Sequence, residues 1–71
     1  MKVIKKEDYH NEGIFIDLDV SFKPYTNLIN NHYKYLTKDK VYYFYCHCGV
    51  KAKRVVSILD AYGYNVVLVL N

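Results

Sequence analysis

A short loop near the middle of the chain carries the residues best suited to covalent chemistry. It comprises Cys46, His47, Cys48, Gly49, Val50 and Lys51, and it follows directly on an apolar run. A thiol is a nucleophile only as its thiolate, and backbone N–H groups at the start of a helix stabilise a negative charge beside them. The loop therefore indicates a reactive Cys46 thiolate, with the N–H groups of residues 47–51 arranged around the sulfur and a bound anion.

The flanking sequence predicts the elements that hold this loop. Three runs that are apolar or aromatic at every position but Asp17 have the length of strands covered on both faces: Ile14–Leu18, Val41–Tyr45 and Val66–Leu70. Two stretches repeat apolar residues at helical spacing, one from Leu28 to Leu36 and one from Ala52 to Tyr62. Thr26 or Asn27 is the expected N-cap of the first helix, and Gly63 suits the end of the second. Val3-Ile4 is a candidate short strand, followed by an exposed helical turn.

Alternating strands and helices of this kind predict a parallel α/β sheet with right-handed crossovers. Ligands of such sheets bind beyond the carboxyl ends of the strands. Cys46 and Asp17 both lie at strand ends, so we expect them to share one rim with Lys51. Asp17 is expected either to orient the loop or only to cap a turn.

Composition narrows the classes of protein that fit. With 71 residues, 52% of them hydrophobic and 24% charged, the chain is expected to form one small globular domain, residues 1–71. It has no apolar run of membrane-spanning length and no secretory segment at residues 1–8, so a cytoplasmic protein is expected. The net charge of +3 is spread along the chain without a basic block, which argues against nucleic acid as a partner.

The loop resembles the active-site loop of single-domain rhodanese-like sulfurtransferases, in which a cysteine is followed by two variable residues, a glycine, one variable residue and an arginine or its substitute. Further similarity lies in Ile16-Asp17, which resembles the family's strand ending in an aspartate. The passage into the last strand also resembles the family's, through Leu59, Tyr62-Gly63-Tyr64 and Val66-Val67.

The resemblance implies a persulfide mechanism without a cofactor. The Cys46 thiolate would take a sulfur atom from a donor such as thiosulfate, hold it as a persulfide, and pass it to a thiophilic acceptor. The backbone of His47, Cys48, Gly49 and Val50 would bind the anionic sulfur, and Lys51 would attract an anionic donor. Asp17 would support the loop.

The chain also departs from the family pattern. Asp19 stands where the family has an arginine, and the segment between Asp19 and Leu28 is much shorter than the family's. The family also continues beyond the position of Asn71. We therefore expect a small three-layer α/β domain, rhodanese-like but shortened, that lacks the usual edge strand. Ile14–Leu18 would become the sheet edge and a candidate surface for self-association.

Several alternatives compete with this interpretation. A non-catalytic rhodanese-like module that binds a partner and a thiol redox or sulfur-sensing domain both retain the loop without sulfur transfer. A phosphatase needs one more residue before its arginine, and that position is Ala52. A metal site is not expected, because Cys46, His47 and Cys48 form a single cluster and His10 and His32 fall in stretches expected to be exposed. For Cys48, a packing or bystander role is favoured over a disulfide with Cys46.

Overall fold

The computed structural model describes all 71 residues. It contains four strands, three α-helices and one 3₁₀ turn, which follow in chain order: β1 (Lys2–Lys5), η1 (Lys6–Asp8), β2 (Ile14–Asp17), α1 (Thr26–Asn30), α2 (His32–Tyr35), β3 (Val41–Tyr45), α3 (Val50–Ala61) and β4 (Asn65–Leu70). None of the helices combines the length and the apolar character needed to cross a bilayer.

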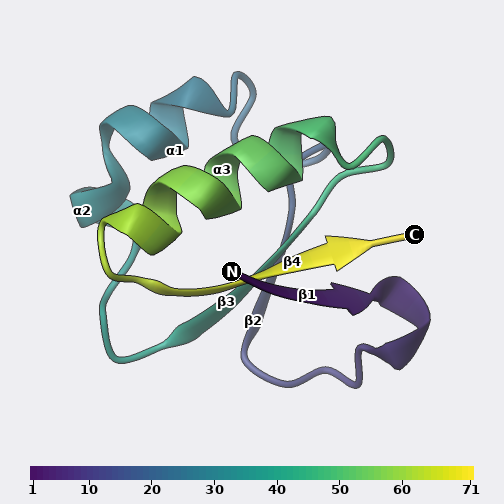
Figure 1. Cartoon of the computed structure of the whole chain (residues 1–71). Coiled ribbons are helices and arrows are strands. Elements are labelled where there is room, and N and C mark those ends of the chain that lie inside the picture. Colours follow the sequence, from purple (N-terminus) through teal and green to yellow (C-terminus); the bar gives the residue numbers. More distant parts are fainter.

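The four strands form one parallel sheet in the order β1-β4-β3-β2. All three α-helices lie on one face of the sheet, while η1 lies in the connection from β1 to β2 (Figure 1). That connection packs on the opposite face, through contacts of Tyr9 with Phe15 and Tyr43. The predicted α/β class, a small domain built on a parallel sheet, is confirmed.

The main core lies between the sheet and the helices. Its buried side chains come from α1, α3, β3, β4 and the connecting segments, and include Leu28, Phe44, Val55, Leu59 and Leu68. Phe44 and Leu68 are register partners on neighbouring strands, so their side chains leave the sheet on the same face. Cys46 and Ala52 belong to this same cluster, which means that the candidate site rests directly on the core.

The helix predicted to run from Thr26 to Leu36 is two short helices instead. The chain breaks at Asn31, whose φ of −126° and ψ of 30° are not helical. The expected N-cap is also wrong, because Tyr25 occupies that position and no side chain bonds to the first turn.

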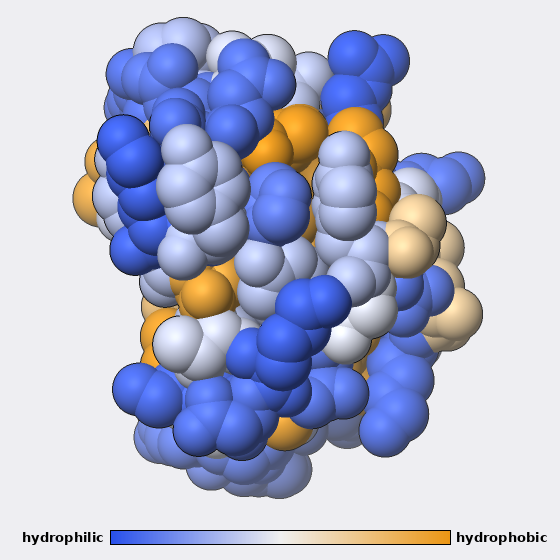
Figure 2. All heavy atoms as spheres, turned by 90° about the vertical axis from the view of Figure 1, so that its left-hand side faces the viewer, coloured by the Kyte–Doolittle hydropathy of each residue, from blue (hydrophilic) through white to orange (hydrophobic).

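His32, expected to be exposed, is partly buried. Its Nδ1 lies 2.6 Å from the Tyr64 hydroxyl, and its ring stacks on Tyr62 at 4.5 Å between centroids. These contacts join α2 to the segment that follows α3. Figure 2 shows this end of the molecule, where apolar atoms are scattered among polar side chains rather than gathered in one patch.

The predicted helix after Gly49 is confirmed as α3, and glycines mark both of its ends. Gly49 has a φ of 79° and Gly63 a φ of 90°, which only glycine adopts without strain. At the C-terminal end, the N–H of Tyr64 donates to the Leu59 carbonyl at 3.1 Å and the N–H of Gly63 to Asp60 at 2.9 Å. This pattern is the Schellman motif expected of a C′ glycine. Tyr62, expected on the apolar face, lies beyond the helix and is 55% exposed.

Candidate functional site

Cys46 lies where β3 passes into the loop that opens α3. The residue is only 1% exposed, and its Sγ accepts the backbone N–H of Ala52 across 3.3 Å. Ala52 is in the first turn of α3, where N–H groups have no carbonyl partner within the helix. The sulfur therefore occupies a position next to the positive end of the α3 dipole.

The backbone N–H groups of the loop do not all point to one acceptor. The N–H of Gly49 donates to the Cys46 carbonyl at 3.2 Å, and the N–H of His47 donates to Asp19 Oδ2 at 2.6 Å. The N–H groups of Cys48, Val50 and Lys51 have no acceptor within the protein. The expected arrangement, with donors from residues 47–51 meeting the sulfur, is thus replaced by a single contact from Ala52 and three free donors nearby.

Asp19 is the residue that binds the loop most closely from outside it. Besides the His47 N–H, its carboxylate accepts the Lys51 ammonium, with Nζ and Oδ1 2.7 Å apart. Hydrogen bonds from Lys51 and from the His47 backbone lower the pKa of Asp19, and the hydrogen bond to Asp19 raises the pKa of Lys51. Lys51, expected to meet an anionic donor, is therefore already paired with an anion of the protein.

Asp17 shapes the turn after β2 and makes no hydrogen bond to the loop. Its Oδ1 accepts the N–H of Asp19 at 2.9 Å, and its carbonyl accepts the N–H groups of Val20 and Ser21. Asp17 therefore caps a turn and does not itself orient the loop. Its effect on the loop is indirect, because this turn places the Asp19 carboxylate.

Asn71 ties the loop to the neighbouring strands. Its Nδ2 donates to the His47 carbonyl at 2.8 Å, and its Oδ1 accepts the Tyr45 hydroxyl at 2.9 Å. Together with Asp19, it holds both polar backbone groups of His47. The base of the loop is therefore anchored, although its tip is open to solvent.

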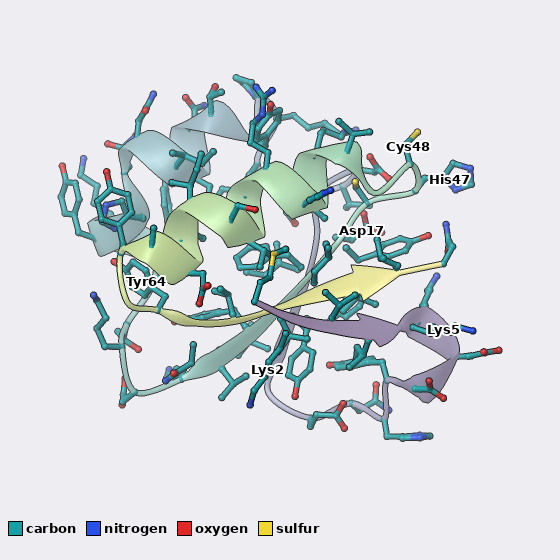
Figure 3. All side chains as sticks on the ribbon, viewed as in Figure 1. Lys2, Lys5, Asp17, His47, Cys48 and Tyr64 are labelled. Atoms are coloured by element: carbon teal, nitrogen blue, oxygen red, sulfur yellow. The ribbon has the colours of Figure 1, made fainter.

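The side chains of His47 and Cys48 point outward at the tip of the loop (Figure 3). Both are exposed, and Cys46 and Cys48 are free thiols. No group of three or more histidine, cysteine, aspartate or glutamate side chains is arranged to hold a metal. Three surface hollows are lined by residues outside the loop of residues 46–51, so none of these three leads to Cys46.

Three contacts at the site were not assigned from the sequence. The sequence places Asp19 near the cysteine loop, in the segment after a strand end, but predicts no contact for it, although a second acid two residues after Asp17 is a usable signal. Ala52 lies one residue beyond the predicted donors, and a backbone N–H carries no side-chain signal. Nothing local marks Asn71, because its two partners are more than twenty residues away.

Comparison with protein-family models, with curated proteins and with solved structures found no match to this chain.

Proposed function

We propose that the protein is a sulfurtransferase that carries sulfane sulfur on Cys46. The observation that supports this most strongly is the contact between Cys46 Sγ and the Ala52 N–H, at the junction of a parallel strand and a helix N-terminus. A thiolate or persulfide in that position is favoured by the helix dipole and by a directed N–H donor. We further propose a cytoplasmic location, because a reducing compartment keeps both cysteines as thiols.

The chemistry proceeds in two balanced steps. The Cys46 thiolate attacks the outer sulfur of thiosulfate, the new Sγ–S bond forms, and sulfite leaves with the electron pair of the broken S–S bond. The product is the anionic persulfide Cys46–S–S⁻. A thiophilic acceptor such as cyanide then attacks the terminal sulfur, which regenerates the thiolate and releases thiocyanate.

The loop supplies what an extra anionic sulfur requires. The free N–H groups of Cys48, Val50 and Lys51 provide donors for the persulfide, while the left-handed conformation of Gly49 keeps the turn tight. Because Cys46 is buried, a donor reaches the sulfur only when the exposed tip of the loop moves at Cys48. The hydrogen bonds to the His47 backbone hold the end of β3 in place.

The decisive test is sulfur loading. The protein is incubated with thiosulfate and its intact mass is measured, with Cys48→Ser as the matched control for Cys46→Ser. We expect the wild type and Cys48→Ser to gain the mass of one sulfur atom, cyanide to remove it as thiocyanate, and Cys46→Ser to gain nothing. A wild type that takes up no sulfur would reject the proposal, and loading of Cys46→Ser would place the nucleophile elsewhere.

The burial of Cys46 favours a second candidate, a non-catalytic module that binds a partner or a second copy of itself. In that case the thiol only fills the core, and β2 supplies the contact surface, since β2 is a sheet edge and Ile14 is 38% exposed. Light scattering at increasing concentration tests this candidate. We expect association in the wild type and its loss in Ile14→Lys, whereas a strictly monomeric wild type would argue against self-association.

A further inference from the structure

The Asp19 carboxylate occupies two groups of the loop that could otherwise meet an incoming anion, the His47 N–H and the Lys51 ammonium. One oxygen accepts the His47 N–H at 2.6 Å and the other pairs with Lys51 at 2.7 Å. Asp19 is itself held in place, because its own N–H donates to Asp17 at 2.9 Å. The turn after β2 thus places a negative charge at the rim beside the cysteine loop.

This placement changes the electrostatics of the rim. The charge of Lys51 is cancelled at contact distance, and the Lys51 and Asp19 side chains are 39% and 36% exposed, so the pair is only partly screened by solvent. A doubly charged donor approaching Cys46 therefore gains no net attraction from the Lys51 side chain and stands close to the like charge of Asp19. A donor with one negative charge or none is much less affected.

We propose that Asp19 is a specificity-determining residue that selects sulfur donors of low charge, such as a persulfide carried on an alkyl thiol, over dianionic thiosulfate. The inference rests on the proposed sulfurtransferase function and names the donor class of the same site. With Asp19 in place, thiosulfate is a usable but poor donor.

Sulfur transfer from such a persulfide to Cys46 needs no further reactant. The Cys46 thiolate attacks the terminal sulfur of a persulfide R–S–S–H, so that the Sγ–S bond forms and the donor S–S bond breaks. The thiolate R–S⁻ leaves with the electron pair and takes the proton of the new persulfide. The products are Cys46–S–S⁻ and the thiol R–SH.

The first test compares two donors on variants matched in net charge. Asp19→Asn removes the charge with little change of shape, and Asp39→Asn removes an equal charge in the loop that precedes β3, at the other end of that strand. We expect Asp19→Asn to lower the KM for thiosulfate about fivefold, with kcat and the KM for an alkyl persulfide, which carries at most one negative charge, changed by less than about twofold. Asp39→Asn should leave both KM values near those of the wild type. Equal effects on both donors, or none, would overturn the inference.

The second test does not depend on sulfur transfer. Sulfate, a dianion without a transferable sulfur, is titrated while the amide resonances of residues 47–51 are followed by NMR. We expect sulfate to bind more tightly to Asp19→Asn than to the wild type, and the double variant Asp19→Asn/Lys51→Gln to return to the weak affinity of the wild type. Tighter sulfate binding without any sulfur loading would reject the proposed function alone. Sulfur loading with unchanged KM and unchanged sulfate affinity would reject the role of Asp19 alone.

Should Asp19→Asn unfold, Asp19→Ser provides a second uncharged side chain for the same measurements, with thermal unfolding of each variant as the check on its fold. The expected order of sulfate affinity is the same for both substitutions, and a weaker affinity in a folded uncharged variant contradicts the inference.

Discussion

The hydroxyl of Tyr64 lies 2.6 Å from His32 Nδ1, and this bond links two segments that are 32 residues apart in the chain. Tyr64 is 6% exposed, so water does not readily replace a lost partner there. The bond joins α2 to the start of β4 and thereby fixes the helical layer at the end opposite the cysteine loop (Figure 1).

We therefore expect Tyr64→Phe to lower the free energy of unfolding by about 1 kcal/mol, because the His32 nitrogen loses its buried partner. Urea-induced unfolding measures the change. Tyr33→Phe is the matched control, since Tyr33 is 67% exposed and its hydroxyl has no partner. Equal losses in the two variants would show that the hydrogen bond contributes nothing specific.

The two cysteines should differ sharply in their reaction with a thiol-alkylating reagent. Cys48 is exposed whereas Cys46 is 1% exposed, so alkylation of Cys46 requires the loop to open first. We expect Cys46 in Cys48→Ser to react at least about tenfold more slowly than Cys48 in Cys46→Ser, and the two rates to converge in denaturant. Equal rates under native conditions would contradict the buried position of the thiol.

Gly49 should tolerate substitution poorly. Its φ of 79° is costly for residues with a Cβ, and a Cβ at this position would lie 3.2 Å from Leu70 Cδ2. We expect Gly49→Ala to lower the free energy of unfolding by about 1–2 kcal/mol and to reduce sulfur loading, because the turn that positions the loop donors loosens. Asn adopts this backbone region more readily than Ala, so Gly49→Asn should cost less. The opposite order would argue against a left-handed residue here.

The pair formed by Asp19 and Lys51 should make stability depend on pH at both extremes. The pKa of Asp19 is lowered from 3.8, so its stabilising effect is present above pH 3.8 and is lost as the pH falls through the lower folded value. The pKa of Lys51 is raised from 10.5, so its effect is present below pH 10.5 and is lost as the pH rises through the higher folded value.

Melting temperatures measured against pH check this expectation. Asp19→Asn should melt below the wild type between these limits, and the difference should shrink under stronger acid. Asp8→Asn, which alters an exposed aspartate of η1 without a salt bridge, controls for the change in net charge. A difference between wild type and Asp19→Asn that stays constant into strong acid would show that the carboxylate is not stabilised by its partners.

Much of the framework around Cys46 was predictable because its signals are local. The aromatic run Val41–Tyr45 predicts a buried strand, the periodicity after Gly49 predicts α3, and Gly63 marks the helix end through its left-handed backbone. Each of these features depends on a few consecutive residues. The parallel direction of the strands follows from their alternation with helices.

The break at Asn31 shows where such local signals fail. The periodicity from Leu28 to Leu36 suits one helix, but the ring of His32 stacks on Tyr62 and its nitrogen bonds to Tyr64. These long-range contacts accompany the non-helical backbone conformation at Asn31, which the neighbouring residues do not predict.

The sequence by itself determined that a cysteine ends a buried strand, that a glycine turn follows it, and that a helix begins there, because strand pattern, turn residue and helical period are all properties of neighbouring residues. Only the tertiary structure decided which groups meet that cysteine and its loop. Asp19 reaches Lys51 and His47 from the turn after β2, and Asn71 reaches His47 from the position that follows β4. Side-chain partners of this kind depend on how strands distant in sequence are placed side by side, and spacing along the chain does not encode that distance.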